Sequence, residues 1–196
     1  LLSKSTLCKE RSNTMSKVCI FLADGFEEIE GLTVVNLLRR ANIDITMVSI
    51  MEKEYITGAH QIEVKADKLY EEMDFSQTEV LILPGGMPGT KHLGEHKELV
   101  NLLKAFNEKG KLIGAICAAP SVLGENGILN NKKATCYPGF EDKLEKAILT
   151  KNKLVKDQNI ITAKGMGVSI EFALAIVEEI KGKEIAGQIA DSIQFT

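Results

Sequence analysis

The feature of this sequence that most constrains its fold is the regular alternation of short apolar runs with segments of helical period. The apolar runs have the length of buried strands and are separated by turn residues. They cover residues 18–23, 43–50, 80–83, 112–116 and 160–163. Between them, apolar side chains recur at i, i+3, i+4 and i+7, which places them on one face of a helix. The three sets are Val34, Leu37, Leu38 and Ala41; Leu99, Leu102, Leu103 and Phe106; and Ala173, Ile176, Val177 and Ile180.

Strands that alternate with amphipathic helices predict an α/β fold, with a doubly wound, mainly parallel sheet covered by helices on both faces. A weaker alternation over residues 61–65, after Gly58, predicts an added antiparallel hairpin. The 196 residues suit one domain with a continuous core. Regular patterning starts directly after Met15, so we expect a single domain over residues 15–196 and a disordered or non-native extension over residues 1–14.

Composition excludes several classes of protein. The formal net charge is -3, with acidic and basic residues mixed throughout, so we expect no specific nucleic-acid binding. No apolar run approaches the ~20 residues that span a bilayer, and no signal-peptide pattern opens the chain. We therefore expect a cytoplasmic protein without membrane contact. Its four cysteines form no Cys-x-x-Cys pair, which argues against a disulfide scaffold or a zinc knuckle.

One metal-binding pattern needs separate treatment. Residues 92–96 read His-x-x-Glu-His, the pattern of inverted zinc peptidases. Gly94 interrupts the helix that this pattern requires, and no further ligand is evident. We interpret His92 and His96 as solvated side chains and expect no metal site.

Polar and small residues follow four of the predicted strands, at residues 24–30, 84–89, 117–120 and 165–167. In a doubly wound sheet, ligands bind outside the carboxyl ends of the strands, at the point where the strand order reverses. All four segments could therefore line one rim, and chemistry is expected there.

Cys117 has the sequence context of a nucleophile elbow. Residues 112–116 run directly into it, and small residues with Pro120 then suit a helix start. A helix N-terminus stabilises negative charge, so we expect a lowered thiol pKa and a reactive thiol. The alternative is a small core residue where sheet meets helix. Glu30 alone reads as one of three acids that complement a helix N-terminus, and only proximity to Cys117 would distinguish it.

Backbone donors could complete such a site. Gly85 and Gly86 follow an apolar strand, and the N–H of Gly86 could form an oxyanion site with the N–H of Ala118. The alternative is an ordinary tight turn. Residues 85–91 lack the spacing of a phosphate-binding loop, and residues 165–167 lack the third glycine of a dinucleotide fingerprint, so no cofactor is expected.

Taken together, these segments resemble the ThiJ/PfpI superfamily, in its DJ-1 branch of protein deglycases. The likeness runs from Met15 to Phe195, and four stretches carry it. They are residues 23–30 (ADGFEEIE), 83–86 (LPGG), 115–120 (AICAAP) and 165–173 (GMGVSIEFA). The resemblance implies a flavodoxin-like fold, usually a homodimer, without a cofactor.

The resemblance also implies roles for individual residues. Cys117 would be the nucleophile and redox-sensitive group, and Glu30 would be a buried, protonated acid hydrogen-bonded to the thiolate. Gly86 and Ala118 match the family's backbone donors. The implied activities are conversion of glyoxal or methylglyoxal to hydroxy acids and repair of early glycation adducts, together with a role in oxidative stress.

One departure from the family concerns position 137. Many relatives place a histidine near the cysteine, whereas this chain has Tyr137, a poor base near neutral pH. This disfavours an amidase or cysteine peptidase unless His60 approaches the thiol. The leading hypothesis is therefore a glyoxalase or deglycase that uses Cys117 and Glu30 on small aldehydes or glycated substrates. A non-catalytic redox sensor or chaperone that uses the same cysteine is the alternative.

Overall fold

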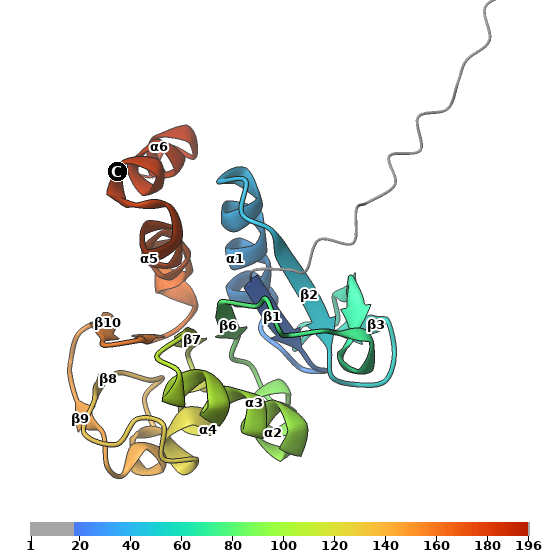
Figure 1. The fold of residues 1–196 in the computed structure, drawn as a ribbon, viewed down its shortest axis with the longest axis vertical. Coiled ribbons are helices and arrows are strands. Elements are labelled where there is room, and N and C mark those ends of the chain that lie inside the picture. The colour runs from blue at the N-terminus through green and yellow to red at the C-terminus, as the bar shows by residue number, and fades with distance from the viewer. Residues whose placement is uncertain (1–17, 196) are drawn as a thin grey trace, which may run out of the picture.

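The computed structural model describes residues 18–195, and its centre is a seven-stranded sheet in the order β10-β11-β7-β6-β1-β2-β5 (Figure 1). Neighbouring strands are parallel except for β10 and β11. The strands are β1 Val18–Leu22, β2 Ile45–Ser49, β5 Lys68–Leu69, β6 Val80–Leu83, β7 Leu112–Ile116, β10 Leu154–Asp157 and β11 Ile160–Ala163. The predicted mainly parallel α/β architecture is confirmed.

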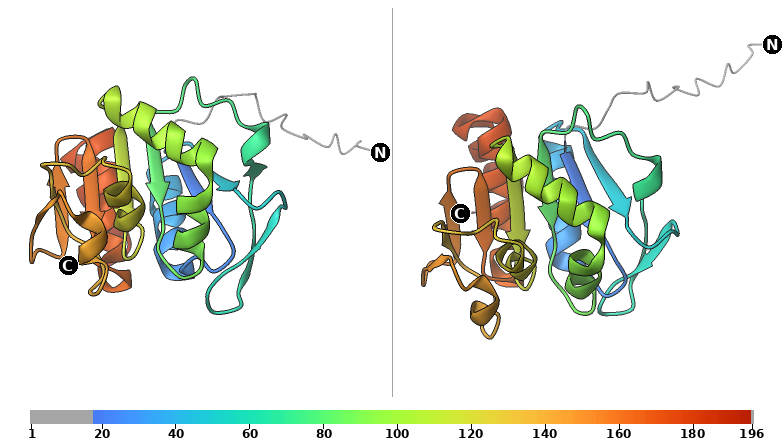
Figure 2. Two further views of the ribbon diagram at one scale, coloured as in Figure 1. Left: turned by 90° about the horizontal axis from the view of Figure 1, so that it is seen from below. Right: turned by 60° about the horizontal axis from the view of Figure 1, so that its bottom comes forward.

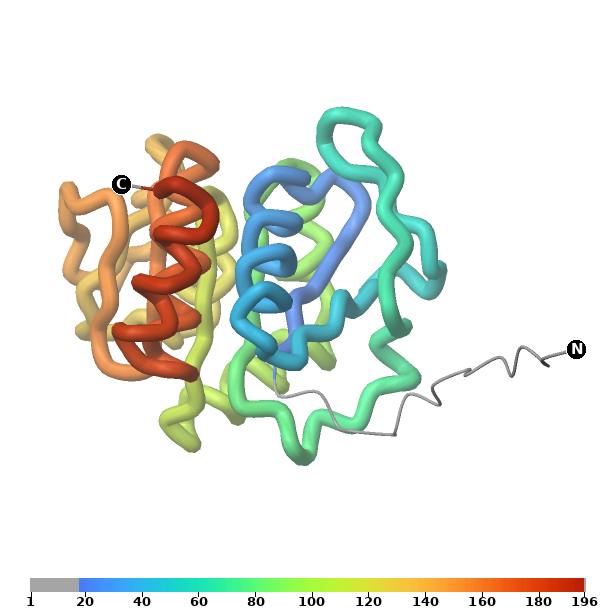
Figure 3. The backbone as a smooth tube through the Cα atoms, turned by 90° about the horizontal axis from the view of Figure 1, so that it is seen from above, coloured from blue at the N-terminus to red at the C-terminus, as the bar shows by residue number. Residues whose placement is uncertain are grey.

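Helices cover both faces of this sheet, as predicted. One face carries α1 Glu28–Arg40, α5 Ser169–Lys181 and α6 Lys183–Ser192, which are seen in front of the sheet in Figure 3. The other face carries α2 Gly89–Glu95, α3 Lys97–Glu108 and α4 Pro120–Glu125, seen in front in Figure 2 (left). Every residue of β1, β2, β6 and β11 is buried, because a sheet enclosed by two helical layers has no solvent-facing side.

The strands that the sequence did not predict are short or lie at edges. β10 pairs antiparallel with β11 and is only partly buried, so it lacks the continuous apolar run of the inner strands. β8 Lys133–Ala134 and β9 Ile148–Leu149 form a separate parallel pair of two residues each. The antiparallel hairpin is confirmed, with β3 Tyr55–Thr57 paired to β4 Glu63–Lys65 as its own small sheet.

The segment around His92 and His96 differs from the prediction. Gly94 does not interrupt the helix, because α2 continues through it to Glu95. His96 is not solvated either. Its Nδ1 accepts a hydrogen bond from the N–H of Leu99 at 3.1 Å, which caps α3, and its ring centroid lies 4.6 Å from that of Tyr70. This histidine therefore has a structural role as a helix cap.

The remaining expectations concern the chain start and membrane contact. Residues 1–14, with Cys8 among them, lie outside the described residues. Across residues 18–195 there is no helix with the length and apolar character needed to span a bilayer.

The strand order places a switch point at β1. From β1 the chain continues to β2 on one side of it, and the later strands β6, β7 and β11 lie on the other side. This is the flavodoxin-like order. Ligand sites in such sheets lie in the crevice at the carboxyl ends of the strands beside the switch. Glu30 follows β1, Gly85 and Gly86 follow β6, and Cys117 follows β7.

Candidate active site

Cys117 occupies a strained corner between β7 and α4. Its φ is +65°, in the left-handed region that non-glycine residues rarely adopt. Two backbone hydrogen bonds hold this conformation: the N–H of Cys117 donates to the carbonyl of Ala163 at 2.9 Å, and its carbonyl accepts from the N–H of Tyr137 at 2.7 Å. Pro120 opens α4 three residues later, with Ala119 as the N-cap. The geometry is that of the nucleophile elbow expected from the sequence.

Glu30 lies beside Cys117 although 87 positions separate them in the chain. It sits in the first turn of α1, is 1% exposed, and its Oε2 accepts the N–H of Gly85 at 2.9 Å. A Cβ on Gly85 would lie 2.6 Å from both Cys117 Cβ and Glu30 Oε2. The absence of a side chain at Gly85 is therefore what lets the two residues meet. Among the described residues, nothing hydrogen-bonds to Glu30 Oε1.

The electrostatics of this pair agree with the expectation for the acid but not for the thiol. Burial raises the pKa of Glu30 to about 7, against opposing hydrogen bonds from Cys117 and the Gly85 N–H. Burial, and next the negative charge of Glu30, raise the pKa of Cys117 to about 12. The expected lowering of the thiol pKa is therefore wrong, because desolvation and the neighbouring carboxylate outweigh the donors that face the sulfur.

Two groups that interact this closely titrate as a unit. Both pKa values are raised, by burial above all, so the pair keeps at least one of its two protons at neutral pH. A buried carboxylate with a pKa near 7 is matched to removing a proton at neutral pH.

Two backbone donors face the sulfur. The N–H groups of Ala118 and Gly86 both hydrogen-bond to Cys117, and each lowers its pKa in part. Gly86 has φ +90°, and a Cβ there would lie 2.3 Å from the backbone nitrogen of Glu27, so no other residue fits. The N–H of Gly85 is already occupied by Glu30, so Gly85 positions the acid and is not a free donor.

Tyr137 also lies near the sulfur. A Cβ on Gly165 would be 3.3 Å from the Tyr137 ring and 3.9 Å from Cys117 Sγ, so both side chains flank the same glycine. Tyr137 is 50% exposed. Gly165 was not among the candidate site residues, and its signal in the sequence was a small-residue segment directly after an apolar strand.

His60 lies with two carboxylates and not with the thiol. Its Nδ1 is 3.0 Å from Glu28 Oε2 and 3.4 Å from Glu27 Oε2. The hydrogen bond to Glu28, followed by the negative charges of Glu27 and Glu28, raises the pKa of His60. Burial would raise the pKa of Glu28, but the His60 side chain and the N–H groups of His60 and Ile62 together lower it. These three side chains are close enough to hold a metal ion, yet the imidazole already pairs with both acids.

The other described cysteines are unsuited to chemistry. Cys19 and Cys136 are buried, so their sulfur atoms are not accessible to a substrate. Cys117 differs from them in being partly exposed on a strained turn.

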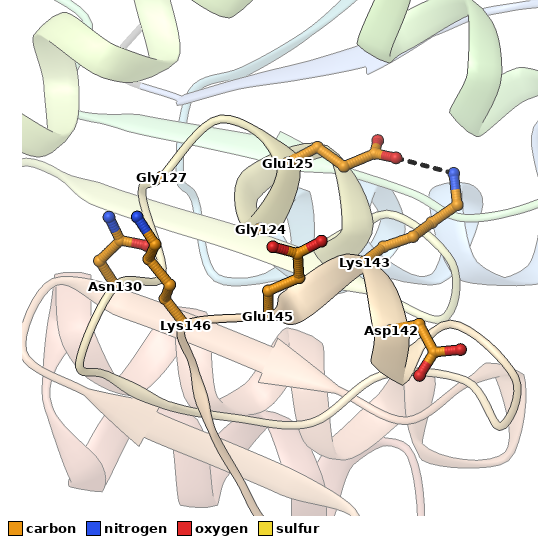
Figure 4. A pocket seen from close by; sticks show the side chains of 8 residues that line it. All are labelled: Gly124, Glu125, Gly127, Asn130, Asp142, Lys143, Glu145 and Lys146. Carbon is orange, nitrogen blue, oxygen red and sulfur yellow. Dashed lines mark hydrogen bonds and ion pairs between the residues drawn. The ribbon is translucent and has the colours of Figure 1, made fainter.

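A separate hollow of about 380 Å³ lies between α4 and the 3₁₀ turn Glu141–Leu144 (Figure 4). Its wall includes an ion pair in which Lys143 Nζ is 2.9 Å from Glu125 Oε1, drawn as a dashed line. Neither Cys117 nor Glu30 lines this hollow. It is distinct from the thiol site.

Comparison with known proteins agrees with the fold and with the resemblance. The family model described as the DJ-1/PfpI family matches residues 16–179. Protein dj-1beta of Drosophila melanogaster is 35% identical over 182 residues, covering 91% of this chain and 97% of that protein. The crystal structure of Drosophila DJ-1beta superposes with a TM-score of 0.88 at 34% identity, covering 93% of this chain and 100% of the other.

Two further relatives differ in length. The glutathione-independent glyoxalase DJ-1 of Schizosaccharomyces pombe is 32% identical over 191 residues, covering 92% of this chain and 100% of the relative. Protein DJ-1 homolog A of Arabidopsis thaliana is 36% identical over 176 residues, covering 88% of this chain, but the match spans only 45% of that protein. The match extends through nearly all the secondary structure described above, and the chain therefore belongs to the DJ-1/PfpI family.

Proposed function

We propose that this chain is a cofactor-independent glyoxalase that converts methylglyoxal, glyoxal and similar α-oxoaldehydes into hydroxy acids. The observation that carries the proposal is the meeting of a strained, partly exposed Cys117 with the buried carboxyl of Glu30, whose pKa is raised to about 7. The name of the fission-yeast relative, a glutathione-independent glyoxalase, supports the same chemistry.

In the first step, the sulfur of Cys117 bonds to the aldehyde carbon while the thiol proton passes to Glu30. Negative charge develops on the aldehyde oxygen, and we assign its stabilisation to the N–H groups of Gly86 and Ala118, because both interact with the sulfur that forms the new bond. Glu30 then returns the proton to that oxygen. The product is a hemithioacetal on Cys117, and Glu30 is again a carboxylate.

In the second step, Glu30 removes the hydrogen from the former aldehyde carbon as a proton, and the adjacent carbonyl oxygen takes up a proton to give an enediol. A proton is then returned to the second carbon, and the hydroxyl on the first carbon loses its proton as it becomes the thioester carbonyl. The first carbon is oxidised by two electrons and the second is reduced by two, so no external oxidant or reductant is required. The result is a thioester of a 2-hydroxy acid. Water attacks the thioester, the carbon–sulfur bond breaks, and the hydroxy acid leaves while Cys117 regains its proton.

The same site could act on early glycation adducts, and we include this deglycase activity in the proposal. At a hemiaminal adduct, the carbon–sulfur bond to Cys117 would form as the carbon–nitrogen bond breaks, and the amine would leave with the thiol proton, carried by Glu30. The product is the same hemithioacetal, so the later steps would be unchanged. The adduct must then disappear faster than it releases free aldehyde spontaneously. Amine release measured with a saturating aldehyde scavenger would separate the two routes, and a rate equal to the enzyme-free rate would remove the deglycase activity from the proposal.

The direct test is conversion of methylglyoxal to lactate without glutathione or any added thiol, followed by NMR. We expect lactate in amounts that greatly exceed the protein concentration. We also expect kcat/KM to rise with pH through about 7, because the base form of Glu30 is required. Absence of lactate would exclude the glyoxalase.

A second candidate function is redox sensing through the same thiol. Cys117 is partly exposed, whereas Cys19 and Cys136 are buried. We expect mild peroxide to oxidise Cys117 first, to sulfenic and then sulfinic acid, as read by mass spectrometry of peptides. Prior oxidation of Cys19 or Cys136 would contradict this expectation. A reducing compartment such as the cytoplasm would keep the resting thiol, and we propose that the protein acts there.

An amidase or peptidase is less well supported. Such chemistry depends on an imidazole beside the cysteine, whereas Tyr137 occupies that neighbourhood and His60 pairs with Glu28.

We further propose that the chain forms a homodimer through the helical face of α1, α5 and α6 (Figure 3). A hollow of about 430 Å³ on this face is lined mainly by apolar side chains, including Ile29, Leu32, Ile62 and Ile170. Ile29 and Ile62 are 51% and 53% exposed, which is unfavourable for a lone chain and favourable in a self-complementary interface.

The dimer is tested by placing a charge in this face. Ile29→Glu is expected to shift the molecular mass measured by light scattering from that of a dimer to that of a monomer, because a buried unpaired carboxylate opposes association. Ile148→Glu, at an equally exposed position on β9, is the matched control and should leave the dimer intact. A monomeric wild-type protein would refute the proposal.

A further inference from the structure

A groove runs between α2 and α4, next to the loop that carries Gly86. Its volume is about 360 Å³, near the lower end of the range of small-molecule pockets. We call it the α2–α4 groove. Its lining residues are Met87, Thr90, Lys91, Gly94, Glu95, Ser121, Val122, Glu125, Phe140 and Lys143.

The groove is joined to the thiol site through three of its wall residues. Met87 directly follows Gly86, whose N–H faces the sulfur. Ser121 Oγ donates to the carbonyl of Ala118, the residue after the nucleophile, at 2.7 Å. The N–H of Phe140 donates at 3.1 Å to the carbonyl of Tyr137, whose own N–H bonds to Cys117. The wall of the groove is therefore built from residues directly linked to those that surround Cys117.

The charged groups of the groove are paired with one another. Lys143 Nζ lies 2.9 Å from Glu125 Oε1, an ion pair that also borders the hollow in Figure 4. Lys91 Nζ lies 3.8 Å from Glu95 Oε1. With two cations and two anions, the wall has no net charge to attract a charged ligand group.

The apolar side chains of the wall are Met87, Phe140 and Val122, of which Phe140 is partly buried and Val122 is 2% exposed. Met87 is 52% exposed, so much of its apolar side chain is in contact with water in the free protein. The nearby Oγ1 of Thr90 is buried and has no hydrogen-bond partner among residues 18–195. An apolar group that covers Met87 would remove this surface from water and gain free energy.

We propose that the α2–α4 groove is a subsite for the part of the aldehyde that does not react, and that it selects an uncharged apolar substituent such as an aryl ring. This inference rests on the proposed glyoxalase function and names its substrate class. Methylglyoxal, whose substituent is a methyl group, leaves the groove empty. An aryl-substituted α-oxoaldehyde fills it while its aldehyde carbon reaches Cys117.

The test compares phenylglyoxal with methylglyoxal by the ratio of their kcat/KM values. Met87→Gln keeps the length of the side chain and makes it polar, and we expect it to lower this ratio by about 5-fold or more, in line with the loss of an apolar contact to substrate. Met166→Gln is the matched control. Met166 is 49% exposed and follows Gly165 near the sulfur, but it does not line the groove. This control should change the ratio by less than about 2-fold.

A second measurement separates failure of the subsite from failure of the proposed function, because it requires no turnover. The rates at which N-phenylmaleimide and N-methylmaleimide label Cys117 are compared by peptide mass spectrometry, relative to their rates with a free cysteine peptide. We expect the wild type and Met166→Gln to favour the phenyl reagent, and Met87→Gln to lose most of that preference.

The outcomes of the two measurements are distinct. Loss of phenyl preference in Met87→Gln without any aldehyde turnover would support the subsite and refute the glyoxalase. Turnover that depends on Cys117, with ratios unaffected by Met87→Gln, would overturn the subsite and leave the glyoxalase standing. An equal loss in Met87→Gln and Met166→Gln, or no phenyl preference in the wild type, would also overturn the subsite.

Discussion

Replacing Cys117 with alanine is expected to lower kcat/KM for methylglyoxal by about 10³-fold or more, because the bond between sulfur and the aldehyde carbon cannot form and no other described group can replace it. The two other described cysteines are buried, whereas Cys117 is partly exposed. The measurement is the lactate assay, run at equal concentrations of folded protein as judged by circular dichroism.

Cys136→Ala is the matched control, since it removes a thiol of similar size from a buried position. We expect its kcat/KM to remain within about 2-fold of the wild-type value, because Cys136 takes no part in the proposed chemistry. If Cys117→Ala retained wild-type turnover, the nucleophile would be misassigned and the mechanism above would be wrong.

Replacing Glu30 with glutamine is expected to abolish turnover and, in addition, to stabilise the folded protein at alkaline pH relative to the wild type. The folded state raises the pKa of Glu30 from its usual 4.5 to about 7, so between these values the folded chain binds more protons than the unfolded chain. Stability contributed by the protonated carboxyl is therefore complete below pH 4.5 and is lost as pH rises through 7. Glutamine removes this pH dependence.

The size of the effect follows from the shift in pKa. The difference in the free energy of unfolding between Glu30→Gln and the wild type should be about 2 kcal/mol more in favour of the variant at pH 8 than at pH 5. Urea unfolding of both proteins at the two pH values measures this difference. Glu108→Gln, at an exposed position at the end of α3, should show almost none. A Glu30→Gln difference no larger than that of Glu108→Gln would mean that the Glu30 pKa is not raised.

The sequence predicted those strands and turns that depend on the pattern of apolar and small residues within a few positions of each other. The inner strands at residues 80–83, 112–116 and 160–163 coincide with β6, β7 and β11, because burial on both faces makes such strands continuously apolar. The elbow at Cys117 was predictable for a similar reason, since a strand that runs into small residues and Pro120 has few alternatives. β10 was missed because an edge strand with one exposed side lacks that signal.

Long-range electrostatics were less predictable. The sequence suggested a lowered thiol pKa from the helix start alone, but α4 has only six residues, and the buried carboxylate of Glu30 acts in the opposite direction. His60 was a candidate partner of the thiol, and its pairing with Glu28 depends on how the hairpin loop folds back over α1. Gly94 was expected to end a helix, but inside α2 its cost is offset by the packing of its neighbours.

The close approach of two backbones at Gly86 limits how this site can change. A Cβ on Gly86 would collide with the backbone at Glu27. The loop of Gly86 and the turn at the start of α1 therefore pack directly against each other, and a change in the backbone of one requires a change in the other. New substrate preferences are then most accessible through exposed neighbours such as Met87 and Tyr137, which no such fit constrains. A mutational scan should find these positions permissive, and a library designed to widen the range of accepted aldehydes should begin with them.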